Sequence, residues 1–208
     1  SSDLAAPVSD ASPSRNGWSV VVPVKGSAAA KSRLDASPEL AMAIALDSVE
    51  AAAGAARVIV VTSAEATARF AQVGVEVVED AGGGLVVACR QGIAAAGGGR
   101  VAVLLGDVPA LRSAELASAL ELASGHPLAF VADADNDGTT LITALNAADH
   151  APAFGSHSRA AHLAAGYVEL DLPAEWGLRR DVDTARQLAT IPSAVLGPRT
   201  SAALERIP

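Results

Sequence analysis

The sequence predicts a single α/β domain with a mixed, mostly parallel sheet flanked by helices. Short apolar runs alternate with alanine-rich helical patterns, which is typical of a sheet whose strands are joined by crossover helices. A chain of 208 residues, of which 50% are hydrophobic, can bury a core of that size. We place the domain at residues 18–208, behind a polar tail at 1–17 that is rich in Ser, Pro and Asp and that we expect to be flexible.

The first half of the chain alternates strictly between strands and helices. Runs of β-branched residues predict the strands, and alanine-rich stretches predict the helices. Pro38 suits the first turn of a helix and Gly54 suits a stop, so they bound the first helix. The expected elements are a strand at 18–24, a helix at 38–54, a strand at 57–63, a helix at 64–72, a strand at 75–80, a helix at 85–96 and a strand at 100–107.

After residue 107 the alternation becomes less regular, because two strand patterns follow one another without a helix between them. This succession predicts an antiparallel excursion in the second half of the sheet. The expected elements are a helix at 113–124, strands at 127–133 and 139–145, a short helix at 158–166, a last strand at 167–172 and a closing helix at 181–190.

Composition and charge exclude several classes of protein. The formal net charge of −8 argues against a general nucleic-acid binder, which needs a basic face for phosphate contacts. A single cysteine, Cys89, excludes an internal disulfide and fits a reducing compartment. No apolar run reaches the roughly 20 residues that span a bilayer, and the tail lacks the apolar centre of a signal peptide. We therefore expect a cytoplasmic protein without nucleic-acid or membrane partners.

The strand exits are where a site is expected, because ligands of open α/β sheets bind beyond the carboxyl ends of the strands. In this chain the exits are polar, glycine-bearing or charged, and they should converge at one edge of the sheet. They comprise residues 23–33, 80–85, 106–109, 133–140, 154–159 and 179–184.

The first exit, "VPVKGSAAAKSRL", is similar in its order of residues to a phosphate-binding P-loop. A P-loop needs G-x-x-x-x-G-K-[ST], but Lys31 comes one position early after Gly26, and Ala30 stands where glycine is required. What remains is a loop of small residues with three cations, Lys25, Lys31 and Arg33. Either it is a cradle that holds a triphosphate partly through side-chain charge, or it is an ordinary solvated loop.

Three aspartates are candidates for a magnesium site. Asp107 follows an apolar strand in "LLGDVPAL", and Asp181 and Asp183 lie in "RRDVDTA". Mg²⁺ prefers oxygen ligands and takes few protein carboxylates when substrate phosphates supply the rest. The alternatives are a turn aspartate at 107 and a helix N-cap at 183.

Two further exits offer donors for an anionic substrate. The first is Gly138-Thr139-Thr140, with its backbone N–H groups and hydroxyls. The second is the start of the helix expected at 158–166, where free N–H groups and the helix dipole favour an anion. Its candidate residues are Gly155, Ser156 and Ser158, with Arg159 as an added cation. Helix capping by one of the two serines is the alternative.

Other catalytic and metal-binding motifs are missing from the sequence. The run "DADNDG" begins like an EF-hand loop, but its twelfth position is Ala144 where glutamate is required. The four histidines show no zinc-site spacing, and no G-x-S-x-G hydrolase motif occurs. The glycines at 82–84 are too few for a dinucleotide fingerprint and better fit a loop that approaches a base or ribose.

Together these segments resemble the guanylyltransferases of deazaflavin coenzyme F-420 biosynthesis. The resemblance is carried, from about Trp18 to Leu188, by "VPVKGSAAAKSRL", "EDAGGGL", "LLGDVPAL", "DGTTLITA", "FGSHSRAAH" and "DVDTARQL" in that order. The family comprises 2-phospho-L-lactate and phosphoenolpyruvate guanylyltransferases, which are relatives of the molybdenum-cofactor guanylyltransferases. It implies a Rossmann-like nucleotidyltransferase fold, GTP as co-substrate, Mg²⁺ as cofactor and a small phospho-carboxylic acid as acceptor. Phosphoenolpyruvate is our first choice of acid, and a homodimer is left open.

The resemblance also implies roles for individual residues. For the triphosphate it implies Lys25, Gly26, Lys31 and Arg33, and for the guanine side Gly82, Gly83, Gly84 and Leu85. For the acid it implies Thr139 or Thr140, with Gly155 and Ser158, to which we add Ser156. For the metal it implies Asp107 and Asp183, with Asp181 nearby. The residues expected to act in catalysis are Lys25, Lys31, Arg33 and Asp107. Ala81 and Val86 stand where the family more often has Pro and Asn.

In the implied reaction, a phosphate oxygen of the acid attacks the α-phosphorus of GTP and pyrophosphate leaves. That oxygen is already anionic at neutral pH, so no general base is needed, and catalysis rests on positioning and charge neutralisation. Two alternatives stay open. One is another nucleotidyltransferase with a different nucleotide or acceptor, and the other is a catalytically silent ligand-binding relative.

Overall fold

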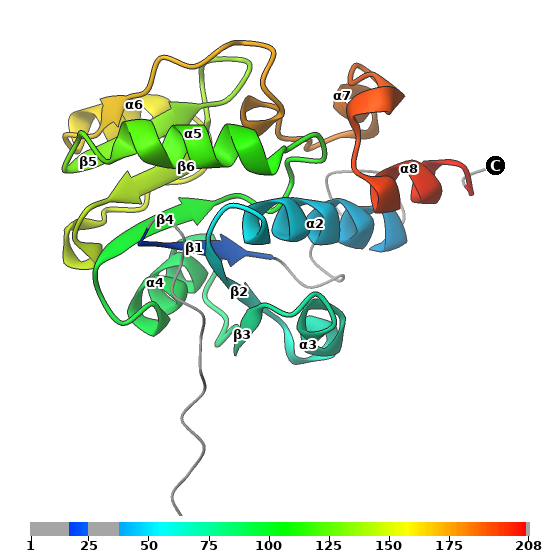
Figure 1. Ribbon diagram of the computed structural model, residues 1–208, viewed down its shortest axis with the longest axis horizontal. Coiled ribbons are helices and arrows are strands. Elements are labelled where there is room, and N and C mark those ends of the chain that lie inside the picture. The colour runs from blue at the N-terminus through cyan, green and yellow to red at the C-terminus, as the bar shows by residue number, and fades with distance from the viewer. Residues whose placement is uncertain (1–16, 25–37, 207–208) are drawn as a thin grey trace, which may run out of the picture.

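The computed structural model describes residues 17–24 and 38–206. The predicted tail at 1–17 falls outside this range except for Gly17. Four predicted nucleotide-site residues also fall outside it: Lys25, Gly26, Lys31 and Arg33. The described chain forms three layers, in which helices cover both faces of a central sheet (Figure 1). Within these residues, no helix combines the length and the apolar character that a membrane crossing needs.

The sheet in the described residues has seven strands in the order β3-β2-β1-β4-β6-β5-β7. The strands are β1 (Trp18–Pro23), β2 (Arg57–Thr62), β3 (Glu76–Glu79), β4 (Arg100–Leu104), β5 (Leu128–Ala132), β6 (Thr139–Ala144) and β7 (Val168–Glu169). β1 pairs in parallel with β2 and β4, whereas β6 is antiparallel to both β4 and β5. The predicted mixed sheet with an antiparallel excursion is thus confirmed. Because β6 is reversed, it begins at the edge where β1, β4 and β5 end.

The α-helices of the described chain are α2 (Pro38–Ala53), α3 (Ala64–Ala71), α4 (Leu85–Ala95), α5 (Ser113–Ala123), α6 (Ser158–Ala164), α7 (Ala185–Leu188) and α8 (Pro198–Leu204). Short 3₁₀ turns are η1 (Ala147–Asp149), η2 (Gly177–Arg179) and η3 (Ser193–Val195). Buried residues of α2, α3 and α5 share one core cluster, while those of α4 pack on the opposite face of the sheet. The strand and helix positions predicted up to residue 145 agree with these bounds to within a few residues.

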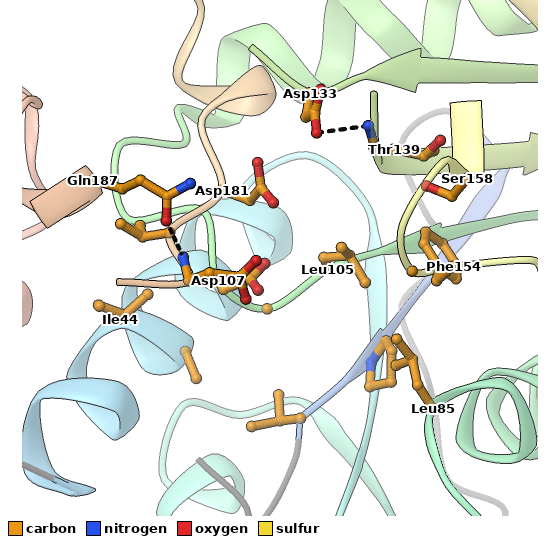
Figure 2. A pocket seen from close by; sticks show the side chains of 18 of the residues that line it. Ile44, Leu85, Leu105, Asp107, Asp133, Thr139, Phe154, Ser158, Asp181 and Gln187 are labelled. Atoms are coloured by element: carbon orange, nitrogen blue, oxygen red, sulfur yellow. Dashed lines mark hydrogen bonds between the residues drawn. The ribbon is translucent and has the colours of Figure 1, made fainter. Parts of the chain in front are cut away.

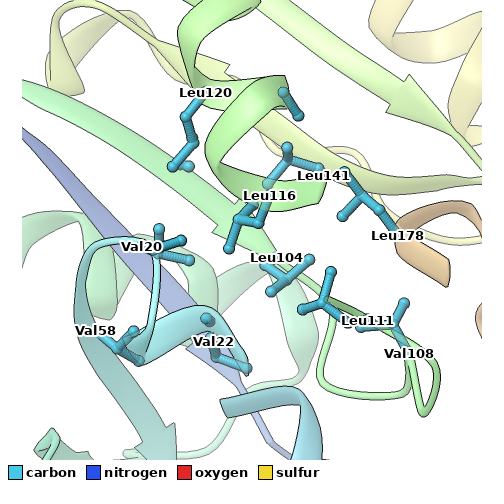
Figure 3. Packing of buried hydrophobic residues seen from close by; sticks show 14 of the residues in the cluster. Val20, Val22, Val58, Leu104, Val108, Leu111, Leu116, Leu120, Leu141 and Leu178 are labelled. Atoms are coloured by element: carbon cyan, nitrogen blue, oxygen red, sulfur yellow. The ribbon is translucent and has the colours of Figure 1, made fainter. Parts of the chain in front are cut away.

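The core follows from the alternation of side chains along the strands. In β1, Val20 and Val22 face the cluster of α2 and α5, and Val21 faces the cluster of α4. Leu116 and Leu120 of α5 point down onto the sheet in that first cluster (Figure 3). Full burial of a leucine contributes about 1.5–3 kcal/mol, so aliphatic side chains alone can hold the sheet although the chain has few aromatic residues.

Two elements of the second half differ from the prediction. The strand expected at 167–172 is only Val168–Glu169, which pairs with Ala129 and Phe130 of β5. The backbone bond from Leu170 N to Phe130 O follows directly after it. The closing helix expected at 181–190 is only Ala185–Leu188. Its N-cap is Thr184, whose hydroxyl accepts from Gln187 N at 3.2 Å in a capping box, so Asp183 is not the cap.

A last helix, α8, lies in a stretch for which the sequence pattern predicts no helix. It packs against α2 (Figure 1), and its first turn is capped from there rather than by its own residues. The carboxylate of Asp47, which is 6% exposed, accepts hydrogen bonds from Thr200 N at 2.7 Å, Thr200 Oγ1 at 2.7 Å and Arg199 N at 3.2 Å. A buried carboxylate on a helix N-terminus satisfies orphan N–H groups and meets the positive end of the helix dipole.

Candidate functional site

The candidate site is a pocket of about 410 Å³ at the carboxyl edge of the sheet. Its size is within the range of small-ligand pockets. All six predicted strand exits contribute to its wall, and the first residues of α2 close one side. Figure 2 shows Asp107, Asp181 and Gln187 on one side of the pocket and Thr139, Ser158 and Phe154 on the other. The described chain stops at Val24 and resumes at Pro38, and both residues line this pocket.

The acidic side of the pocket joins two segments that are far apart in the sequence. Asp107 lies in the loop after β4, and Asp181 and Asp183 lie between η2 and α7; all three line the pocket. Val182 N donates to Asp107 O at 2.9 Å, which fixes the second segment beside the first. Gln187 Oε1 in turn accepts from Asp183 N at 2.9 Å, so two successive backbone N–H groups of this segment are bonded. The structure therefore brings together the three predicted metal-site carboxylates.

The electrostatics of this side favour a cation. Burial, together with the negative charges of Asp107, Asp133 and Asp183, raises the pKa of Asp181 from 3.8 to about 7. Among residues 17–24 and 38–206, no group of three or more His, Cys, Asp or Glu side chains is arranged to hold a metal ion by itself. These carboxylates can therefore hold Mg²⁺ only if oxygens of the substrates supply the remaining ligands. A bound cation would reduce the repulsion between these carboxylates, which is one cause of the raised pKa of Asp181.

A second group of aspartates lines the pocket at the turn between β5 and β6. It consists of Asp133, Asp135 and Asp137. Asp133 shapes the turn, since its carboxylate accepts from Gly138 N at 2.7 Å and from Asp137 N at 3.0 Å. As a motif this run resembles only an incomplete EF-hand loop. Its position directly after the β5 strand is the signal by which residues 133–140 were predicted to lie at the ligand-binding edge.

The hydroxyl side of the pocket contains four of the five predicted acid-binding residues. Thr139, Gly155, Ser156 and Ser158 line it. Thr140 does not; it is fully buried in β6. Between the two threonines that the sequence left open, the wall of the pocket is therefore formed by Thr139. The reversed direction of β6 explains this position, because the strand begins at the ligand-binding edge.

Two contacts at the start of α6 bear on the interpretation of the sequence. Arg159, the candidate added cation, pairs with Glu169, with 2.8 Å between Arg159 Nη2 and Glu169 Oε2. Neither serine caps the helix, since the N-cap is His157 with a left-handed backbone at φ 58°. His157 instead contacts Asp137, with 2.7 Å between Nδ1 and Oδ1, and so joins this turn to the aspartate turn after β5.

The glycine loop before α4 contributes to the pocket through Leu85, whereas Gly82, Gly83 and Gly84 do not line it. All three glycines have positive φ, at 83°, 98° and 92°, which explains why this stretch needs glycine. Gln91 holds the loop from α4 by accepting from Ala81 N at 3.1 Å.

The pocket also has an apolar part, of which only Leu85 was predicted as a site residue. Leu85, Leu105 and Phe154 line it (Figure 2), and α2 adds Ile44 and Ala45. Nothing in the sequence distinguishes Leu105, Ile44 and Ala45 from the apolar residues of the core. They offer an apolar surface suited to a flat ring or a carbon chain beside the acidic side.

A layered α/β fold with a reversed strand next to β4 and a polar pocket at the carboxyl edge is that of the nucleotidyltransferases. Residues 28–171 match the family model of the MobA-like NTP transferase domain, and the chain belongs to that family. One solved structure with this fold is a nucleotidyl transferase from Methanothermobacter thermautotrophicus (TM-score 0.62, 23% identity), covering 86% of this chain and 97% of that one. Another is Rv0371c from Mycobacterium tuberculosis in complex with manganese (TM-score 0.54, 20% identity), covering 83% and 96%.

Part of the chain is closely similar to proteins named phosphoenolpyruvate guanylyltransferase. The identity to the protein of Sanguibacter keddieii is 54% over 109 residues, which cover 51% of this chain and 38% of that protein. The identity to the protein of Streptomyces coelicolor is 49% over 107 residues, which cover 51% of this chain and 50% of that protein. The chain thus matches half or less of the length of each of these two relatives.

Proposed function

We propose that the chain is a guanylyltransferase that moves GMP from GTP to the phosphate of a small phospho-carboxylic acid and releases pyrophosphate. Phosphoenolpyruvate is the favoured acceptor, with 2-phospho-L-lactate as the closest alternative, and coenzyme F-420 biosynthesis is the favoured pathway. The names of the two relatives support the choice of nucleotide and acid. The MobA-like domain supports the reaction class.

The observation that carries the proposal is that one pocket combines carboxylates with a separate group of hydroxyl and backbone donors. The acidic side holds Asp107, Asp181 and Asp183, and the opposite side presents hydroxyl and backbone groups of Thr139, Gly155 and Ser158. A reaction between two phosphates needs both: oxygen ligands for a cation between the phosphates, and neutral donors for the remaining anionic oxygens of the acid.

In this proposal the aspartates hold Mg²⁺, which would neutralise charge on the phosphates that it contacts. Asp107 and Asp183 supply the carboxylates, with Asp181 next to them. Lys25, Lys31 and Arg33 hold the triphosphate, and the loop from Gly82 to Leu85 faces the guanine; the three cations lie outside the described residues. Thr139, Gly155, Ser156 and Ser158 hold the acid.

The chemistry requires positioning more than proton transfer. An oxygen of the acid's phosphate forms the new bond to the α-phosphorus of GTP, and the bond from that phosphorus to the oxygen bridging the β-phosphorus breaks. The nucleophile is anionic at neutral pH and the leaving group is pyrophosphate, so no residue has to take up a proton. The site residues therefore act by holding the two phosphates in line and by balancing their charge.

The test is a matrix of substrates with the product identified by mass. GTP, ATP, CTP and UTP are each paired with phosphoenolpyruvate, 2-phospholactate and 3-phosphoglycerate in the presence of Mg²⁺. We expect pyrophosphate release and a guanylylated acid with GTP, at the highest rate with phosphoenolpyruvate. A higher rate with another nucleotide would correct the base preference, on which Ala81 and Val86 bear. Folded protein that binds GTP but forms no product with any acid would contradict the proposal.

A further inference from the structure

A buried histidine stands directly behind the hydroxyl side of the pocket. His162, on α6, is 0% exposed and does not line the pocket itself. Its ring lies among three aromatic rings, with centroid distances of 5.3 Å to Tyr167, 5.5 Å to Phe154 and 6.0 Å to Phe130. Burial lowers the pKa of His162 to about 4, so the ring is neutral at physiological pH.

The hydrogen bonds of this ring fix which nitrogen carries the proton. The backbone N–H of Ala153 lies 3.1 Å from Nε2 and can only donate, so Nε2 is the acceptor. In a neutral imidazole the proton is then on Nδ1. Nδ1 lies 3.0 Å from the hydroxyl oxygen of Thr139, so the ring donates and Thr139 accepts.

The tautomer decides what Thr139 can offer to a ligand. Because the hydroxyl oxygen accepts from His162, its own proton is available to a group in the pocket that Thr139 lines. An anionic phosphate or carboxylate oxygen has only lone pairs, so it requires such a donor. In the opposite tautomer the Thr139 proton would go to Nδ1, and the hydroxyl would turn its lone pairs toward the anion.

The same ring also fixes the chain that leads to Gly155. Ala153 N is held by His162, and Ala151 N donates to the Tyr167 hydroxyl at 2.8 Å. This segment is thus held by buried side chains rather than by strand pairing. Gly155, two residues further on, lines the pocket with φ 130°, in a region that favours glycine. One ring therefore holds two parts of the acid-facing wall, the Thr139 hydroxyl and the backbone before Gly155.

We propose that His162 is a positioning residue for the acceptor acid, which it serves by holding the Thr139 hydroxyl as a donor and by anchoring the backbone before Gly155. This inference rests on the proposed function, because it assigns the hydroxyl side of the pocket to the acid. It predicts that changes at His162 weaken use of the acid and leave use of the nucleotide unaffected.

Two substitutions separate the two hydrogen bonds of the ring. In His162→Gln, the side-chain oxygen can reach the Nε2 position and accept from Ala153, but the donor to Thr139 is lost. In His162→Asn, the side-chain amide can occupy the Nδ1 position and donate to Thr139, but the acceptor for Ala153 is lost. His126→Gln is the control, since His126 lies in the turn between α5 and β5 and does not line the pocket.

The measurement is the KM for the acid and the KM for GTP for each variant. We expect His162→Gln to raise the KM for the acid about tenfold or more, the effect of losing one hydrogen bond to a charged group, with the KM for GTP unchanged. Thr139→Val should produce the same change, and the double variant should be no worse than either single variant, because both remove one interaction. His126→Gln should leave both KM values unchanged.

Two outcomes would overturn the inference while the proposed function stands: unchanged KM values in His162→Gln, or equal increases for the acid and for GTP. Ring ¹⁵N spectra of the protein without substrate provide a separate test that also serves if a variant fails to fold. We expect the Nδ1–H tautomer at neutral pH, and an Nε2–H tautomer would overturn the inference. A wild-type protein that makes no guanylylated acid, but shows the Nδ1–H tautomer, would instead contradict the proposed function.

Discussion

The backbone N–H of Val182 donates a hydrogen bond to the carbonyl oxygen of Asp107, with 2.9 Å between the two atoms. This bond joins the loop after β4 to the segment before α7. Because Asp181 and Asp183 stand on either side of Val182, it also sets the three carboxylates around one pocket. The acidic side of the site therefore depends on a backbone contact as much as on the acidic residues themselves.

The charge of Asp107 should be essential for transfer and dispensable for folding. Asp107→Asn preserves the size of the side chain and removes one of the negative charges around the proposed cation. We expect the rate of pyrophosphate release to fall by about a hundredfold or more, with little change in melting temperature. Asp171→Asn, at an exposed position outside the pocket lining, is the control and should leave the rate unchanged. A near-native rate in Asp107→Asn would remove this residue from the catalytic site.

The raised pKa of Asp181 predicts how stability depends on pH in the absence of Mg²⁺. The folded protein holds the proton up to about pH 7, whereas the unfolded chain releases it near 3.8. The charged form is therefore costly in the folded state, and this cost disappears as the pH falls through about 7 toward 4. At about 1.4 kcal/mol per pKa unit before solvent screening, we expect a gain on the order of 1–2 kcal/mol in the free energy of unfolding.

Denaturant unfolding in the presence of a chelator measures this effect, with Asp181→Asn as the reference. The variant should be more stable than the wild type above about pH 7, and the difference should shrink on acidification. The reference is needed because His162, whose pKa is lowered from 6.5 to about 4, destabilises the fold as the pH falls through that interval. A difference between wild type and Asp181→Asn that does not change with pH would show that Asp181 is not held as described.

Asp47 should stabilise the fold without taking part in the reaction. Its buried carboxylate caps α8 through three hydrogen bonds, so Asp47→Ala leaves two backbone N–H groups and a hydroxyl without their acceptor. We expect a loss of about 2–4 kcal/mol in the free energy of unfolding. Glu50→Ala is the control, because it removes only the exposed ion pair with Arg199 and should cost less than about 1 kcal/mol. Similar losses in both variants would contradict the capping role.

Gly177 controls the approach of η2 to the loop that follows Asp107. A Cβ at this position would overlap the carbonyl oxygen of Ala110, which is backbone and cannot simply rotate away. Gly177→Ala should therefore push the segment that carries Asp181 and Asp183 away from Asp107. We expect weaker Mg²⁺ binding by calorimetry in the presence of GTP and a loss of about 2 kcal/mol or more in stability. Gly125→Ala, where the added Cβ meets nothing closer than 3.5 Å, is the control and should change neither.

Lys31 lies outside the described residues, and its predicted role in triphosphate binding is tested by kinetics alone. Lys31→Ala removes one of the three cations of the loop after β1. We expect the KM for GTP to rise about tenfold or more while the KM for the acid stays near that of the wild type. Equal increases in the two KM values would place this loop on the acid or on both substrates.

The sequence predicted those parts of the fold and site that depend on local pattern. Apolar runs and alanine-rich stretches located the strands and helices up to residue 145, because the pattern of buried and exposed positions within an element is visible in its own local sequence. The rule that ligands bind at the carboxyl edge of the sheet correctly predicted that Asp107 and Asp183 share one pocket. The choice between Thr139 and Thr140 could not be made, since the strand pattern does not reveal which of them reaches the pocket.

The features that the sequence did not reveal arise from tertiary contacts. The helix expected at 181–190 is short because Val182 N bonds to Asp107 O, and α8 is stabilised by Asp47 from another helix. Arg159 forms an ion pair with Glu169, which lies on β7. His162 ends the segment "FGSHSRAAH", but the resemblance implies no role for it, and its two hydrogen bonds, to Thr139 and Ala153, are what connect it to the site.

The reaction that we propose for this pocket is the transfer of GMP from GTP to the phosphate of a phospho-carboxylic acid. The most direct measurement is ³¹P NMR of wild-type protein incubated with GTP, Mg²⁺ and phosphoenolpyruvate, with Asp107→Asn in parallel. We expect two coupled diphosphate signals from the guanylylated acid and an equal amount of pyrophosphate, both absent with the variant. GDP and inorganic phosphate in place of these products, or identical spectra for wild type and variant, would contradict it.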